Sequence, residues 1–135
     1  MTETTSHNVK RILLVDDEPD VCFMLEKVLI EYGYVVDSYE HPLLALKTFE
    51  AHSYNLVILD IKMPELNGFA LYREIKRLDT KVKICFLTAG ETTPYYWAYS
   101  DIFSSLPANH LIRKPIENEE LMKRIKEIIA DDTTT

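Results

Sequence analysis

Carboxylates end two apolar segments of this sequence, and their chemistry suits cation binding and phosphoryl transfer. Asp60 follows the uninterrupted apolar run 56–59, and the adjacent pair Asp16 and Asp17 follows a second run at residues 9–15. Carboxylate oxygens are hard ligands of the kind that Mg²⁺ prefers, and a carboxylate can also attack phosphorus as a nucleophile. Three carboxylates placed together repel one another unless they neutralise or recruit a cation. The acidic residues therefore form a candidate site if the fold brings the two segments together.

Two further segments end in polar residues that complement such a site. Residues 82–87 lead into Thr88, and residues 109–113 lead into Lys114. A lysine supplies a fixed positive charge and a threonine a hydroxyl donor, so the set fits a phosphoryl group held around one nucleophilic carboxylate. Taken singly, these residues also have ordinary interpretations as acids at a helix N-terminus, turn residues or solvated charges. Their occurrence together at four strand ends is what favours a functional site.

The elements that must position these residues alternate between strand and helix. An apolar run without a polar interruption is typical of a strand buried on both faces, as in a parallel sheet covered by helices. Such alternation predicts an α/β fold with right-handed crossovers, in which all strand ends share one edge of the sheet. Ligands of open α/β sheets bind at that edge. Strands are predicted at residues 9–15, 34–39, 56–59, 82–87 and 109–113, and helices at 19–33, from 42, from 69, within 91–107 and at 117–130.

Apolar stripes predict which side of each helix faces the core. Spacings of three and four residues place Met24 in the stripe of the first helix, Leu43 in the second and Leu78 in the third. A fourth stripe is expected from Tyr95, Tyr99, Ile102, Phe103 and Leu106.

Composition excludes several classes of protein. The net charge of −7 argues against a nucleic-acid-binding surface, which needs clustered Lys and Arg. No apolar run reaches membrane-spanning length and the first ten residues lack the apolar core of a signal peptide, so we expect a cytoplasmic protein without membrane contacts. Cys22 and Cys85 lie in apolar segments and are expected to be reduced core residues. One domain is predicted at residues 9–130, between a flexible N-terminus at 1–8 and a flexible tail at 131–135.

Two classes of phosphate-handling protein fit the sequence less well. A metal-dependent phosphohydrolase on a related sheet would carry its nucleophilic Asp after the first strand, usually as D-x-D, whereas this chain has Asp16-Asp17-Glu18. A nucleotide-binding protein would need a glycine-rich loop after a strand, and the three glycines of the chain provide none. Both classes are therefore disfavoured.

Four motifs in a fixed order give the sequence a resemblance to a known family. They are V-D-D-E-P after the first strand, D-I-K-M-P around Asp60, Thr88-Ala89 after the fourth strand and Lys114-Pro115 after the fifth. In this combination the chain resembles the receiver domains of two-component response regulators, from about Arg11 to Ala130. The resemblance implies a (βα)5 flavodoxin-like three-layer sandwich, whose parallel five-stranded sheet has the order 2-1-3-4-5.

The resemblance also implies an activity. Asp60 would accept a phosphoryl group from a phosphohistidine on a sensor histidine kinase or a histidine phosphotransfer protein. Mg²⁺, or Mn²⁺, would be held by Asp16, Asp17, Asp60 and the backbone carbonyl of Lys62, with Asp17 as the more direct ligand. Such a domain catalyses only its own phosphoryl transfer and dephosphorylation and is not an enzyme with a separate substrate. The remaining alternative is a pseudo-receiver, a protein-binding module that is not phosphorylated.

Further roles follow from the same resemblance. Lys114 is similar to the lysine that pairs with the phosphoryl oxygens, and its peptide bond to Pro115 looks like the cis bond of the family. Thr88 is similar to the switch hydroxyl that moves toward the phosphate. Lys62 and Gly90 occupy the positions that tune the lifetime of the phosphorylated state.

The chain departs from the family pattern on its output side. Leu111 stands where the family commonly has Tyr or Phe, which puts the usual coupling between threonine and aromatic ring in doubt, and His110 is a poor replacement because it should point to the other face. Tyr96 and Trp97 do not fit the fourth stripe. With Leu111 they are expected to mark a surface for an unknown downstream protein or for a phosphorylation-dependent homodimer. His7, His41 and His52 form no metal-ligand pattern and are expected at the surface.

Overall fold

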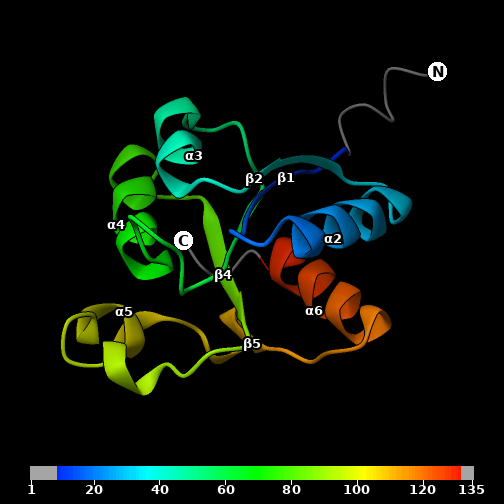
Figure 1. The fold of residues 1–135 in the computed structure, drawn as a ribbon. Coiled ribbons are helices and arrows are strands. Elements are labelled where there is room, and N and C mark those ends of the chain that lie inside the picture. Colours follow the sequence, from blue (N-terminus) through cyan, green and yellow to red (C-terminus); the bar gives the residue numbers. More distant parts are fainter. Residues whose placement is uncertain (1–8, 132–135) are drawn as a thin grey trace.

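Five strands and the helices between them make up the computed structural model, which describes residues 9–131 (Figure 1). The predicted flexible N-terminus at 1–8 and residues 132–135 of the tail predicted at 131–135 lie outside the described residues. The strands are β1 (Arg11–Val15), β2 (Val35–Tyr39), β3 (Leu56–Leu59), β4 (Lys83–Thr88) and β5 (Leu111–Arg113). The helices are α2 (Pro19–Glu31), α3 (Pro42–Thr48), α4 (Gly68–Leu78), α5 (Ser100–Ser105) and α6 (Asn118–Ala130), with 3-10 turns η1 (Thr93–Tyr95) and η2 (Ala108–His110).

The sheet is parallel and its strands lie in the order β2-β1-β3-β4-β5, which confirms the predicted fold class and strand order. Helices α2 and α6 cover one face of the sheet, and α3, α4 and α5 cover the other (Figure 1). The molecule is therefore a three-layer sandwich. None of the helices within residues 9–131 combines the length and apolar character needed to cross a bilayer.

Side chains that alternate along the central strands fill two separate cores. In β3, Val57 and Leu59 pack toward α3, α4 and α5, whereas Leu56 and Ile58 pack toward α2 and α6. Successive side chains of a strand point to opposite faces, so a strand covered on both sides must be apolar at every position. This explains why the run that ends at Asp60 contains no polar residue.

The helical stripes were predicted too wide. Met24 in α2, Leu43 in α3 and Leu78 in α4 are largely exposed, with 62%, 48% and 51% of their surface accessible. Smaller or neighbouring residues face the sheet instead, including Cys22 in α2 and Ala45 in α3. Each short helix covers a narrow strip of sheet, and the spacing of apolar residues alone does not define how much of the helix is covered.

In the segment after β4, one strand and one helix are shorter in the structure than the sequence predicted. The predicted strand 109–113 begins at Leu111, because residues 108–110 form a 3-10 turn that the His110 N–H closes by bonding the Pro107 carbonyl at 2.9 Å. The predicted fourth stripe does pack against the core, but only residues 100–105 of that segment are α-helical. The N–H groups of Tyr99 and Ile102 bond within successive turns, so the segment is a chain of short turns rather than one helix.

Both cysteines are free and buried, as predicted. The Cys22 thiol donates to the Asp16 carbonyl at 3.1 Å, and burial raises the pKa of Cys22 to about 11. Cys85 lies inside the core between the sheet and α6, where burial raises its pKa to about 12. His41 and His52 are exposed, as predicted, and His7 lies outside the described residues.

A buried carboxylate joins two loops on the edge of the sheet away from the acidic site. Asp79, whose side chain is 3% exposed, accepts hydrogen bonds from the His52 N–H at 2.8 Å and from the Lys81 N–H at 3.1 Å. Burial alone would raise the pKa of Asp79, but these backbone donors outweigh it and hold the pKa below its usual value. The hydrogen bond from the His52 N–H also stabilises the backbone conformation of His52, which has a positive φ of 67°.

We expect Asp79→Ala to lower the free energy of unfolding by about 2 kcal/mol, because two backbone N–H groups lose a charged acceptor. A carboxyl with a lowered pKa stabilises the fold above its unfolded pKa of about 4, and that contribution is lost as the pH falls through the folded value. Urea unfolding should therefore show a larger difference between wild type and variant at pH 7 than at pH 3. Glu127→Ala, an exposed change on α6, is the control and should have little effect.

Candidate functional site

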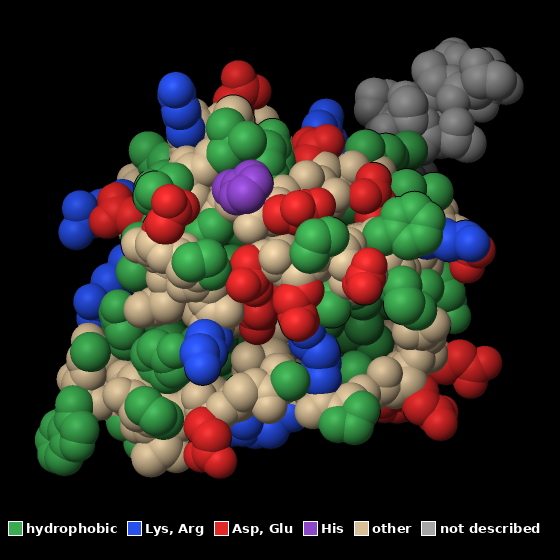
Figure 2. Space-filling model, in the orientation of Figure 1, with side chains coloured by type: hydrophobic (Ala, Val, Ile, Leu, Met, Phe, Trp, Pro, Cys, Tyr) green, Lys and Arg blue, Asp and Glu red, His purple; other side chains and the backbone are tan. Residues whose placement is uncertain are grey.

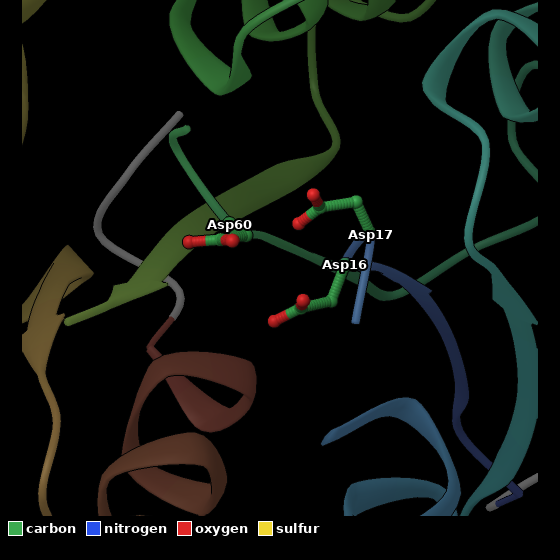
Figure 3. A group of neighbouring side chains, drawn as sticks. All are labelled: Asp16, Asp17 and Asp60. Carbon is green, nitrogen blue, oxygen red and sulfur yellow. The ribbon is translucent and has the colours of Figure 1, made fainter. Parts of the chain in front are cut away.

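Three carboxylates meet at the carboxyl edge of the sheet. Strands β1 and β3 are neighbours, with Val15 paired to Leu59, so the residues that follow them are brought together. One carboxylate oxygen each from Asp16, Asp17 and Asp60 can be chosen so that all three lie within 4.8 Å of one another. Figure 3 shows the three side chains grouped at the two strand ends, with the carboxyl groups of Asp16 and Asp17 directed toward the side on which Asp60 lies.

Backbone hydrogen bonds hold these acidic turns in place. The Asp60 N–H donates to the Val15 carbonyl at 2.9 Å, which extends the pairing of the two strands by one residue. Asp16 is 2% exposed, and its Oδ1 accepts the Glu18 N–H at 3.0 Å. One oxygen of Asp60 accepts the Ile61 N–H at 2.8 Å. The carboxylates are therefore oriented by the backbone before any ligand arrives.

The charges at the site are not balanced by the protein itself. Burial, and then the charge of Asp16, raise the pKa of Asp60 to about 6. Burial also raises the pKa of Asp16 above its ordinary value. The ammonium of Lys114 lies 3.4 Å from Asp16 Oδ2 and acts in the opposite direction on both groups. Three clustered carboxylates, with the Lys114 ammonium beside one of them, fit a divalent cation with oxygen ligands.

An open pocket of about 560 Å³ lies in front of the carboxylates. Acidic side chains gather near the middle of the face shown in Figure 2, with basic side chains beside them. Asp16 lies behind the pocket, whereas most of the other predicted site residues line it directly. The lining residues are Asp17, Glu18, Asp60, Lys62, Met63, Pro64, Thr88, Ala89, Gly90 and Lys114.

Strands β4 and β5 bring the remaining polar residues to the same edge. The Lys114 N–H donates to the Thr88 carbonyl at 2.9 Å, so the two residues lie side by side. The Thr88 side-chain oxygen accepts the Gly90 N–H at 3.2 Å, and the hydroxyl lies close enough to Asp60 to lower the pKa of that carboxyl slightly. The peptide bond between Lys114 and Pro115 is cis.

Two residues next to the site had no structural role assigned to them from the sequence. Asn67 caps α4, accepting the Ala70 N–H at 2.9 Å and donating to the Tyr99 hydroxyl at 3.1 Å. The preference of Asn for the position before a helix was a usable signal for this cap. Gly68 follows, and its N–H bonds the Ile61 carbonyl at 2.7 Å, which folds the loop after Asp60 back on itself. This close approach leaves no trace in the sequence pattern.

The predicted partner surface divides into two parts. Tyr96 and Trp97 are exposed, with 48% and 95% of their surface accessible. Leu111 is only partly buried but packs against the core on the side of α4 and α5, so it belongs to the interior more than to a free surface. His110 is buried and its Nδ1 lies 2.9 Å from the Ile84 carbonyl, away from the acidic site.

Comparison with known proteins decides the family. A family model described as the response regulator receiver domain matches residues 12–126. The chain belongs to this family. As a receiver domain it is a phosphorylation-accepting signalling domain of the two-component class, and the pseudo-receiver alternative is not favoured.

Relatives of this receiver domain include both curated proteins and solved structures. The uncharacterized transcriptional regulatory protein YkoG of Bacillus subtilis is 31% identical over 123 residues, which are 91% of this chain and 52% of that protein. The chemotaxis protein CheY of the same organism is 36% identical over 80 residues, 58% of this chain and 67% of that protein. The response regulator TrrA of Thermotoga maritima, solved in complex with Mg²⁺-BeF, is 36% identical with a TM-score of 0.72, covering 89% of this chain and 99% of that one.

The fold of the receiver domain also matches a structure without phosphorylation. The non-phosphorylated HemR receiver domain of Leptospira biflexa has a TM-score of 0.77 and 27% identity, covering 90% of this chain and 95% of that chain. The chain spans about half the length of several curated relatives that it matches.

Proposed function

We propose that Asp60 of this receiver domain accepts a phosphoryl group from a phosphohistidine on a sensor histidine kinase or a histidine phosphotransfer protein. The observation that carries the proposal is the convergence of Asp16, Asp17 and Asp60 with Thr88 and Lys114 around one pocket. Like charges at this separation need a cation, and the groups around Asp60 are those that phosphoryl transfer requires.

The transfer needs no separate base. A carboxylate oxygen of Asp60 attacks phosphorus, the bond from phosphorus to the donor imidazole nitrogen breaks, and that nitrogen keeps the electron pair. Lys114 offsets the negative charge of the phosphoryl oxygens, and the Thr88 hydroxyl supplies a hydrogen-bond donor. Mg²⁺ or Mn²⁺, held by Asp16, Asp17, Asp60 and the Lys62 carbonyl, would supply charge neutralisation at the phosphoryl oxygens when bound. The backbone orientation of the carboxylates supports this assignment.

Intact-mass measurement tests the proposal directly. The protein is incubated with acetyl phosphate and Mg²⁺, with an Asp60→Asn variant and a sample containing a chelator as controls. We expect the wild type to gain the mass of one phosphoryl group, and both controls to gain none. An equal gain in the Asp60→Asn variant would place the modification elsewhere and contradict the assignment.

Two residues at the pocket mouth are proposed to tune the lifetime of the phosphorylated state. Lys62 and Gly90 both line the pocket, and the long side chain of Lys62 can cover the phosphoryl group whereas Gly90 leaves space. We expect Lys62→Ala to speed the loss of phosphate about threefold, because water gains access to the acyl phosphate. Decay is followed by intact mass after removal of the donor. Identical decay in wild type and variant would remove Lys62 from this role.

Tyr96 and Trp97 are proposed as the partner surface, since large aromatic side chains left exposed commonly mark protein contacts. The partner would be a downstream protein or a second copy of the domain. We expect Trp97→Ala to weaken association of the phosphorylated protein at least tenfold, as for an interface anchor. Sedimentation with and without acetyl phosphate measures this for the homodimer, and Leu44→Ala, an exposed change on α3, is the matched control. An unchanged dimerisation constant would exclude Trp97 from a homodimer interface.

The cellular location of the domain and the kinds of molecule that it contacts are also proposals. Two free, buried thiols are compatible with a reducing cytoplasm. The domain is proposed to act on no separate substrate and not to contact nucleic acid through residues 9–131. YkoG, a relative about twice as long, is named a transcriptional regulatory protein, so regulation of transcription through a partner or a further segment is compatible with this view.

A further inference from the structure

An arginine on β5 holds the loop that follows β4. The Arg113 Nη2 donates to the Thr92 hydroxyl oxygen at 2.9 Å, and its Nη1 donates to the Gly90 carbonyl at 3.4 Å. Arg113 directly precedes Lys114, and Gly90 lies two residues after Thr88. One side chain therefore connects the two strand ends that carry the threonine and the lysine of the site.

The same loop forms a wall between two hollows. Ala89 and Gly90 line the pocket in front of Asp60, and they also line a second hollow of about 310 Å³ that contains Arg113 and Tyr96. The guanidinium thus contacts the loop from the side opposite the acidic site. Any movement of the loop toward Asp60 must stretch or break the contacts with Arg113.

Hydrogen bonding couples the loop to the Thr88 hydroxyl. The Gly90 N–H donates to the Thr88 side-chain oxygen at 3.2 Å, so the two groups move together. A hydroxyl that turns to donate to an oxygen of a phosphoryl group on Asp60 pulls the Gly90 peptide with it. The carbonyl of Gly90 is already 3.4 Å from Arg113 Nη1, at the outer limit of a hydrogen bond, so this contact is the first to be lost.

We propose that Arg113 is a positioning residue that holds the loop at residues 89–92 in its unphosphorylated place and thereby slows phosphoryl uptake by Asp60. The proposal rests on the proposed phosphorylation of Asp60. It gives β5 a hydrogen-bonded link to the loop at a strand where Leu111, an apolar and partly buried side chain, offers none. Releasing the link in advance lowers the cost of moving Thr88 toward the phosphoryl group.

Three variants test the link. Arg113→Met removes the guanidinium and keeps an unbranched side chain, Thr92→Val removes the hydroxyl acceptor and keeps the charge of Arg113, and the double variant combines them. Each single variant is expected to speed amide hydrogen exchange at Gly90 and Thr92. Each should also raise the rate of phosphorylation by acetyl phosphate and Mg²⁺ by roughly two- to tenfold, the net worth of about one hydrogen bond. The double variant should exchange and take up phosphate at nearly the same rates as Arg113→Met, because both changes remove the contact between Arg113 and Thr92.

Control variants distinguish the proposed positioning role of Arg113 from an effect of its charge and from a general loss of stability. Arg113→Lys keeps the charge and can reach only one of the two acceptors, so its rate should fall between wild type and Arg113→Met. Arg124→Met removes a partly exposed arginine of α6 that pairs with Glu120 and should change neither exchange in the loop nor uptake. Melting temperatures near that of the wild type would show that the fold is intact.

The exchange and uptake rates of the variants either support or contradict the proposed role of Arg113. Faster exchange together with faster uptake in Arg113→Met and Thr92→Val supports the proposal. If the wild type is phosphorylated on Asp60 but the variants show unchanged exchange or unchanged uptake, the proposed role of Arg113 is wrong. The proposed function of the domain is not affected by that result. A wild type that takes up no phosphoryl group overturns both.

Discussion

Lys114→Met is expected to lower the rate of phosphoryl transfer to Asp60 about a hundredfold, the effect of removing one preorganised group that stabilises a developing charge. The ammonium lies 3.4 Å from Asp16 Oδ2 at the rear of the pocket. It lowers the pKa of both Asp16 and Asp60, so its loss raises both pKa values and reduces the ionised fraction of the nucleophile. Initial rates with saturating acetyl phosphate and Mg²⁺ measure the effect.

A matched control variant changes the net charge of the protein by the same amount as Lys114→Met. Lys126→Met removes one exposed lysine from α6 that does not line the pocket, and it should leave the rate of transfer unchanged. If Lys114→Met retains a rate within about threefold of the wild type, the charge of Lys114 does not contribute as the mechanism requires.

Gly68→Ala should cause a large loss of stability. A Cβ at this position would lie 2.2 Å from the Asp60 carbonyl oxygen and 2.9 Å from the Ile61 Cα, and both are backbone atoms that no rotamer change can move. We expect the free energy of unfolding to fall by about 3 kcal/mol, at the upper end of the cost of overpacking. Urea unfolding measures the loss, and phosphorylation of the folded fraction measures the displacement of Asp60.

Gly90 provides the comparison for this change. A Cβ at Gly90 would have the Thr88 hydroxyl oxygen as its neighbour at 3.8 Å, an ordinary contact. We therefore expect Gly90→Ala to change the free energy of unfolding by less than about 0.5 kcal/mol. Equal stabilities for the two variants would show that the loop after Asp60 can yield at low cost.

The sequence was informative wherever a strand is buried on both faces. The run before Asp60 had to be apolar at each position, and its abrupt end placed the carboxylate at the sheet edge. Parallel pairing then brought Asp16, Asp17 and Asp60 together without knowledge of any loop. Thr88 and Lys114 were located by the same reasoning, since each also directly follows a strand or ends one.

Features that depend on tertiary contacts were beyond the reach of the sequence. The exposure of Met24 and Leu43 follows from how much of each helix the sheet covers, which residue spacing does not encode. Nothing in the sequence singled out Arg113, because its acceptors lie 21 and 23 residues earlier in a loop of irregular turns. The bond from His52 to Asp79 likewise joins residues 27 positions apart.

The two buried cysteines give this protein internal reporters of its own opening. Each thiol is shielded and protonated at neutral pH in the folded state, so a thiol-specific reagent can label it only after the surrounding structure opens. Labelling of Cys22 would follow fraying of α2 next to the acidic turn, whereas labelling of Cys85 would require separation of α6 from the sheet. The ratio of the two labelling rates would therefore distinguish local breathing beside Asp16 from unfolding of the whole domain.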